Sequence, residues 1–235
     1  RQSVEYSQTA NWAVLDYASR NRDHLLSNIW RMGMNSIERG NRDSWTVLPF
    51  EVEKAQEELG ENTLGGLADY RRSLQSVDDR DPRGFIIPSS QADFATATKF
   101  INTLIKNGVD VHQAGDDFDI GNHSYPSGSY VVKANQAFRP HVMDMFTAQQ
   151  HPNDFAYPGG PPTPPYDNAG WTLAFQMGVE FDPIFVALDG PFERLEELQV
   201  IADGIFVGQG EDGYLFDHSQ NNSFLVLNKL LEKGH

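Results

Sequence analysis

The chain of 235 residues contains no cysteine, which excludes disulfides, Cys-ligated zinc, iron–sulfur clusters and a cysteine nucleophile. It also lacks an apolar run of about 18 residues, the length that a membrane-spanning helix needs, so no membrane insertion is expected. Basic residues are scarce, with 18 Lys and Arg against 33 Asp and Glu and a net charge of -15. Because so acidic a protein repels nucleic acid and anionic membrane surfaces, neither is expected as a partner.

Several signatures of hydrolases and phosphate-binding proteins are absent as well. None of the seven histidines is followed three residues later by glutamate, the spacing that brings imidazole and carboxylate to one zinc ion in carboxypeptidases. No Gly-x-Ser-x-Gly turn is present, so a serine hydrolase of the α/β type is not expected. The glycine-rich stretch 204–213 lacks the Lys-Ser/Thr pair of a phosphate loop. The sequence therefore predicts no catalytic residue.

The composition that is present is typical of a globular protein, with 39% apolar and 22% charged residues. Glycine and proline punctuate the chain and suggest its domain boundaries. We expect a helical segment over 1–48, forming the end of an upstream domain, and a helical linker region over 49–83. These segments are followed by an α/β domain over 84–207 and by the start of a second, truncated α/β unit over 208–235.

The N-terminal segment has the periodicity of an amphipathic helix. The pattern over 6–39 predicts one long helix or two abutting helices that end at Gly40. Such a helix cannot bury its apolar face alone, so we expect another domain to cover it. The residues of this face are Leu26, Ile29, Trp30, Gly33 and Ile37.

The clearest unit lies over 84–114. An apolar strand at 85–88 leads into polar residues that can cap a helix. The helix that follows is amphipathic and ends at Asn107-Gly108. A second strand follows at 109–114. Further along, 128–134 is predicted to be a strand and 138–148 a helix. Strand–helix–strand units build parallel sheets. The sequence therefore predicts a three-layer α/β fold with a mostly parallel sheet and an N-terminal helical segment.

Two stretches of the chain look like copies of one another. Both 84–108 and 213–234 begin with glycine, an aromatic residue and two apolar residues, continue to Ser-Gln, and end in a helical pattern closed by lysine and glycine. The first copy continues into a second strand, whereas the second stops at His235. We therefore expect the chain to be a piece of a larger protein.

The most physical prediction of a site follows from the predicted sheet. Ligands of open parallel sheets gather beyond the carboxyl ends of the strands, which would place the two Ser-Gln segments at one crevice. Near the proline-rich loop, Tyr166, Trp171 and Phe175 either line a cleft for peptide or sugar or belong to the core. The predicted ligand-binding residues are Ser89, Ser90, Gln91, His218, Ser219, Gln220, Tyr166 and Trp171.

A metal site is a weaker alternative. His141 and Asp144 would share one face of the helix over 138–148, and His151 and Asp154 repeat this spacing in sequence typical of a loop. Such pairs are more typical of the protein surface than of a metal centre. We therefore expect neither a metal nor another cofactor in this chain.

Several segments together resemble a known family. They are Asn-Arg-Asp-His-Leu-Leu at 21–26 with Arg-Met-Gly at 31–33, Tyr-Pro-Ser-Gly-Ser-Tyr-Val-Val at 125–132, and Tyr-Asp-Asn-Ala-Gly-Trp-Thr-Leu at 166–173 with Gln-Met-Gly-Val at 176–179. These segments are similar to large secreted bacterial zinc carboxypeptidases of the carboxypeptidase A type. The resemblance covers most of the chain, but only the part of those proteins that follows the catalytic domain.

The resemblance implies an α/β region similar to flavodoxins and class I glutamine amidotransferases. The family's zinc ligands and catalytic glutamate have no matching positions here, and amidotransferase chemistry requires a cysteine. It implies a secreted or periplasmic, non-catalytic accessory region that serves an upstream peptidase domain, with zinc only in that domain. The alternatives are a stand-alone module that binds peptide or glycan, and a cryptic metal-dependent hydrolase built on His141, Asp144, His151 and Asp154.

Overall fold

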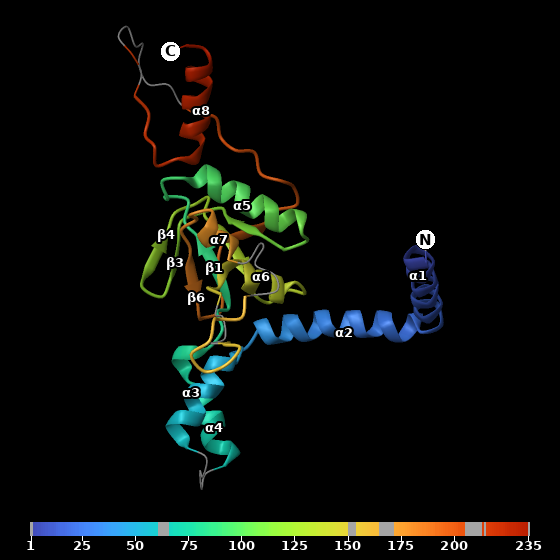
Figure 1. Cartoon of the computed structure of the whole chain (residues 1–235). Helices are drawn as coiled ribbons and strands as arrows, with labels where there is room; N and C mark the ends of the chain where they lie inside the picture. Colours follow the sequence, from blue (N-terminus) through green and yellow to red (C-terminus); the bar gives the residue numbers. More distant parts are fainter. Residues whose placement is uncertain are drawn as a thin grey trace.

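The computed structural model describes residues 2–60, 66–149, 154–164, 172–204, 213 and 215–234. A five-stranded sheet lies at its centre (Figure 1). Its strand order is β6-β1-β5-β2-β7. A separate hairpin pairs β3 with β4. The strands are β1 (Gly84–Ile87), β2 (His112–Ala114), β3 (Phe118–Ile120), β4 (His123–Tyr125), β5 (Tyr130–Lys133), β6 (Asp182–Ile184) and β7 (Phe192–Arg194).

The sheet is antiparallel, so the predicted mostly parallel, three-layer flavodoxin-like fold is wrong. Each described pair of neighbouring strands runs in opposite directions. The two strands of the predicted strand–helix–strand unit, β1 and β2, do run in the same direction, because each is antiparallel to β5. However, β5 lies between them. The unit over 84–114 is therefore a split one, in which a later strand inserts between the two that the helix connects.

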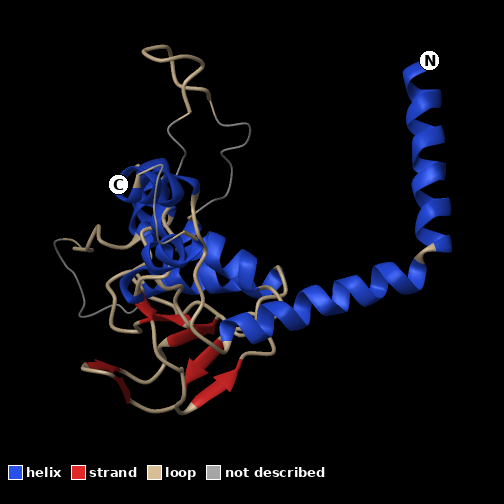
Figure 2. Ribbon diagram, turned by 90° about the horizontal axis from the view of Figure 1, so that it is seen from below, coloured by secondary structure: helices blue, strands red, loops and turns tan. Residues whose placement is uncertain are grey.

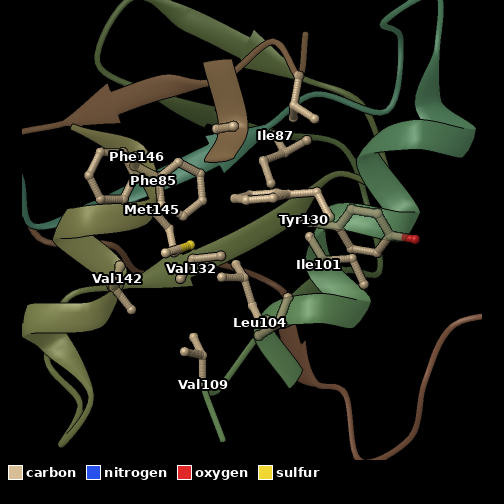
Figure 3. Close-up of a cluster of buried hydrophobic side chains, with 14 of the residues drawn as sticks. Phe85, Ile87, Ile101, Leu104, Val109, Tyr130, Val132, Val142, Met145 and Phe146 are labelled. Atoms are coloured by element: carbon tan, nitrogen blue, oxygen red, sulfur yellow. The ribbon is translucent and has the colours of Figure 1, made fainter. Parts of the chain in front are cut away.

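Three helices cover one face of the sheet. They are α5 (Phe94–Lys106), α6 (Arg139–Phe146) and α7 (Leu173–Gln176). Side chains alternate along a strand, so Phe85 and Ile87 of β1 point to these helices together with Val132 of β5. They pack there against Ile101 and other apolar residues of the helices, as Figure 3 shows. This is the main hydrophobic core.

The hairpin of β3 and β4 covers the opposite face. Ile86 and Val131 point to this side and pack with Phe118 and Tyr125 of the hairpin. Both faces of β1 are therefore buried, and the strand reads as an unbroken apolar run. Such runs are typical of parallel sheets that helices cover on both sides. The prediction of a parallel sheet failed because a hairpin, rather than a second layer of helices, covers this face.

Helices α1 (Gln2–Arg20) and α2 (Arg22–Gly40) form an arm that extends away from the sheet (Figure 1, Figure 2). Of the two predicted alternatives, one long helix or two abutting helices, the structure has the second, and the break falls at Asn21. No residue of α1 is buried, and Gly40 is the one buried residue of α2. The arm therefore meets the rest of the protein at the C-terminal end of α2, beside α6.

A connecting region leads from the arm to the sheet. It contains α3 (Pro49–Leu59), α4 (Leu67–Leu74) and the short 3-10 helix η1 (Val77–Asp79). Asp81, just before β1, accepts hydrogen bonds from the Thr46 backbone N–H at 2.9 Å and from the Ser44 hydroxyl at 3.0 Å. Arg39 of α2 also donates to this carboxylate, at 3.3 Å. The carboxylate of Asp81 thus joins the end of the arm to the entrance of β1.

The second of the two similar stretches ends in a helix, α8 (Asn221–Glu232). Residues 215–217 before it contain no strand, although the first copy has β1 at the corresponding place. Helix α8 lies beside the N-terminal end of α5 in Figure 1, and no residue of α8 is buried. Its start contacts α5 through hydrogen bonds that are described below.

Candidate functional site

The predicted residues Ser89, Ser90 and Gln91 follow β1, as expected, and two of them serve the fold. The Ser89 hydroxyl donates to the Ser127 carbonyl at 2.8 Å, and the Ser89 backbone N–H donates to the Ser129 hydroxyl at 3.0 Å. The buried Gln91 side chain accepts from the Glu180 N–H at 3.1 Å and donates to its carbonyl at 3.2 Å. Only Ser90 is exposed.

His218, Ser219 and Gln220 are exposed and lie in the turn before α8. The next residue, Asn221, donates from its backbone N–H to Asp93 at 2.9 Å and from its side chain to Thr96 at 3.1 Å. The two predicted Ser-Gln segments are therefore brought near each other, through Asp93 at the start of α5. The contact itself consists of hydrogen bonds within the protein.

Asp93 caps the N-terminus of α5. Its carboxylate accepts from the Thr96 N–H at 3.1 Å and from the Thr96 hydroxyl at 2.7 Å. Burial raises the pKa of Asp93, but the hydrogen bonds from Asn221 and Thr96 and the nearby Lys99 outweigh burial and lower this pKa below its ordinary value of 3.8. The ionised carboxylate is thus the form that holds the cap and the start of α8 together.

The alternative metal ligands are only partly described. His141 and Asp144 both lie on α6, as predicted, and His141 contacts the Asn107 side chain at 3.5 Å. Burial raises the pKa of Asp144, while the charge of His141 opposes this rise. Asp154 is exposed, whereas His151 lies outside the described residues. Among the described residues, no three His, Asp or Glu side chains are grouped as metal ligands.

The aromatic pair Tyr166 and Trp171 also lies outside the described residues, but Phe175 belongs to an aromatic hollow of about 310 Å³. The buried rings of Phe85 and Phe146 stack at 4.2 Å on its inner side, and both are labelled in Figure 3. Phe181 meets Phe146 edge to face at 5.1 Å. The hollow is lined mainly by Phe85, Phe146, Phe175, Phe181, Phe185 and Pro183.

Charged residues of the connecting region form the rim of this hollow. Asp78, Asp79 and Arg80 lie at its mouth. Arg80 lies over the Phe185 ring at 5.8 Å and approaches Asp43 at 3.7 Å. The sequence predicts only a helical linker region over 49–83 here, because nothing in the local pattern shows that this stretch faces phenylalanines from four other segments. With aromatic lining and acidic groups at its edge, the hollow is a candidate binding surface.

The helical arm provides a second candidate surface. Eleven of its large apolar side chains are 45% to 69% exposed. Residues 1–40 carry five basic and four acidic residues, so the remainder of the chain holds the whole of the negative net charge. Exposed and weakly charged apolar surface of this kind is typical of protein interfaces. The residues are Val4, Tyr6, Trp12, Val14, Leu15, Tyr17, Leu26, Ile29, Trp30, Met32 and Met34.

No family model, curated protein or solved structure matches the chain. The resemblance to secreted zinc carboxypeptidases therefore stays a prediction. Within the part of the chain that the structure describes, no helix is both long and apolar enough to cross a lipid bilayer.

Proposed function

We propose that the chain is a non-catalytic accessory region that binds a peptidase domain of the zinc carboxypeptidase type through its helical arm. In this proposal the protein is secreted or periplasmic, and the peptidase domain belongs to the same polypeptide. The accessory region positions that domain or its peptide substrate. Peptide hydrolysis and the zinc ion belong to the peptidase domain alone.

The exposed apolar surface of the arm carries the proposal. Trp12 and Trp30 are 68% and 66% exposed, and Ile29 is 66% exposed. Burying one such side chain contributes about 1.5–3 kcal/mol, so an arm that stays uncovered forgoes a large stabilisation. A folded domain packed along α1 and α2 would recover it. The near balance of charges on the arm supports this reading, because the arm does not repel an acidic partner as the remainder of the chain would.

Sedimentation velocity of the chain mixed with a purified peptidase domain of the resembled family tests the proposal. We expect a one-to-one complex. The variant Ile29→Asp/Trp30→Asp should lose it, because two charges would enter the apolar contact. Val200→Asp is the matched control, since Val200 is 93% exposed and lies outside the arm. Absence of a complex with the wild-type chain, or equal binding by the arm variant, would refute the proposal.

Zinc analysis separates this proposal from the cryptic hydrolase. After dialysis of the chain against a weak chelator, the accessory region is expected to retain no stoichiometric zinc. Retention of one zinc ion per chain would contradict the proposal, and His141, Asp144, His151 and Asp154 would then be the residues to substitute.

A further inference from the structure

We infer that the aromatic hollow binds a large apolar side chain of a peptide segment in which a basic residue adjoins that side chain. The apolar side chain would pack on the outward face of Phe175, beside Phe181, and the basic residue would meet Asp78 and Asp79 at the rim. This peptide site is separate from the arm and does not depend on the function proposed above.

The floor of the hollow is preformed. Phe85 and Phe146 are each only 1% exposed, and their stacked rings belong to the main core. Phe181 contacts both rings edge to face, at 5.9 Å and 5.1 Å between centroids. Because the packed core rings of Phe85 and Phe146 hold the partly buried Phe181 in place, little conformational entropy is lost when a ligand side chain packs against Phe181.

The outer wall offers an incomplete aromatic cluster. Phe175 is 56% exposed, although its ring contacts Phe181 edge to face at 5.3 Å. Its outward face is therefore available to another apolar or aromatic group. The volume of about 310 Å³ lies at the small end of ligand pockets. It suits one side chain that an extended peptide places there while the peptide backbone lies across the mouth.

The rim favours positive charge. Asp78 and Asp79 are exposed, and neither has an ion pair within the part of the chain that the structure describes. Arg80, the cation at this edge, already contacts Asp43 and the Phe185 ring. The net charge of -15 adds a long-range attraction for cations. Charge complementarity therefore selects a lysine or arginine beside the apolar side chain.

Fluorescence anisotropy with a dye-labelled, end-blocked tetrapeptide, glycyl-phenylalanyl-lysyl-glycine, tests the inference on the whole chain. We expect saturable binding. Replacing the peptide's phenylalanine by alanine, or its lysine by glutamate, should weaken binding by about tenfold or more. Equal binding of the three peptides would overturn the inference. It would also be overturned if the small amine phenethylamine, which carries the ring and charge without a peptide backbone, displaced the labelled peptide as well as the unlabelled peptide does.

Two variants locate the site. Phe175→Ala should weaken binding by about tenfold, because it removes the exposed wall of the hollow. Phe155→Ala is the matched control, since Phe155 is also an exposed phenylalanine but does not line the hollow. Asp78→Asn/Asp79→Asn should abolish the preference for lysine over glutamate while leaving the requirement for phenylalanine.

Binding that none of these variants changes would overturn the inference. The far-ultraviolet circular dichroism of each variant should match the wild type, because all four substituted positions are exposed.

Discussion

Arg139 of α6 donates a hydrogen bond to the Asp81 carboxylate at 2.7 Å, and the two side chains are only 5% and 7% exposed. The same carboxylate oxygen accepts from Ser44 and Arg39. Two cations and several neutral donors thus satisfy one buried acid. The result is a fixed joint where the end of α2, the entrance to β1 and the start of α6 meet.

Substitution of Asp81 should therefore be strongly destabilising. Asp81→Asn keeps the size of the side chain but leaves the Arg139 charge buried without its partner, which costs about 3–5 kcal/mol. Urea unfolding of the variant measures this loss. Asp203→Asn is the matched control, because it removes the same charge from an exposed residue. Equal unfolding free energies for the two variants would show that the joint contributes nothing.

The glycines of α2 should respond oppositely to alanine. A Cβ added at Gly40 would overlap backbone atoms of Ala134 and Asn135, whereas at Gly33 the nearest atom is the Ala137 Cβ at 3.5 Å. We expect Gly40→Ala to destabilise the protein by about 1–3 kcal/mol. Gly33→Ala should be neutral or stabilise by up to about 1 kcal/mol, because alanine favours the helix. Thermal unfolding of both variants measures the two effects. If the arm were loosely attached at its C-terminal end, both substitutions would be tolerated.

Tyr125 should ionise late. Burial, the hydrogen bond to Asp182 at 3.0 Å and the charge of Asp182 raise the pKa of Tyr125 to about 12. Because this pKa lies above the ordinary value of 10.0, its contribution to stability is complete below pH 10 and is lost as the pH rises from 10 towards 12.

Ultraviolet titration of the wild type and Tyr125→Phe measures this shift. The variant should lack one tyrosine transition at the alkaline end and should lose less stability over that pH range. Tyr157→Phe, which replaces an exposed tyrosine, is the control. If the transition that Tyr125→Phe lacks lies near pH 10, the hydrogen bond from Tyr125 of the hairpin to Asp182 of β6 does not form.

Asp93→Ala should loosen two elements at once. It removes the cap of α5, which costs about 1 kcal/mol, and the acceptor for the Asn221 N–H of α8. Amide hydrogen exchange should therefore become faster at the starts of both helices. Because the folded pKa of Asp93 is lowered, the wild type keeps this contribution above pH 3.8 and loses it as the pH falls further.

The exposed Glu232→Gln, at the far end of α8, is the control for Asp93→Ala and should leave exchange at Asn221 unchanged. Unchanged exchange in Asp93→Ala would contradict the contact between α5 and α8.

Local sequence signals were sufficient to locate several elements. The predicted strand at 85–88 corresponds to β1, and the helix that follows is α5, with Asp93 as its cap and Gly108 at a φ of 85° just after its end. Capping and the chain reversal depend on residues within a few positions, so a single sequence can reveal them. The insertion of β5 between β1 and β2 depends on pairing between strands more than ten residues apart, which no local pattern records.

The candidate sites follow the same division. The positions of Ser89 and Gln91 after a strand could be predicted, but their hydrogen bonds to Ser129 and Glu180 could not, because these partners come from other elements. Phe175 was recognised as a possible cleft residue. Its association with Phe85 and Phe146 arises only when α6 and α7 pack on the sheet.

The two outermost strands of the sheet, β6 and β7, are each three residues long. Pro183 in β6 has no backbone N–H to offer, and β7 carries the exposed charges of Glu193 and Arg194. A second chain that added a strand beside β6 would lack a backbone hydrogen-bond donor at Pro183. One that added a strand beside β7 would meet the charges of Glu193 and Arg194. The borders of the sheet therefore oppose fibre growth, even though the interior strands are as apolar as those of many aggregating peptides.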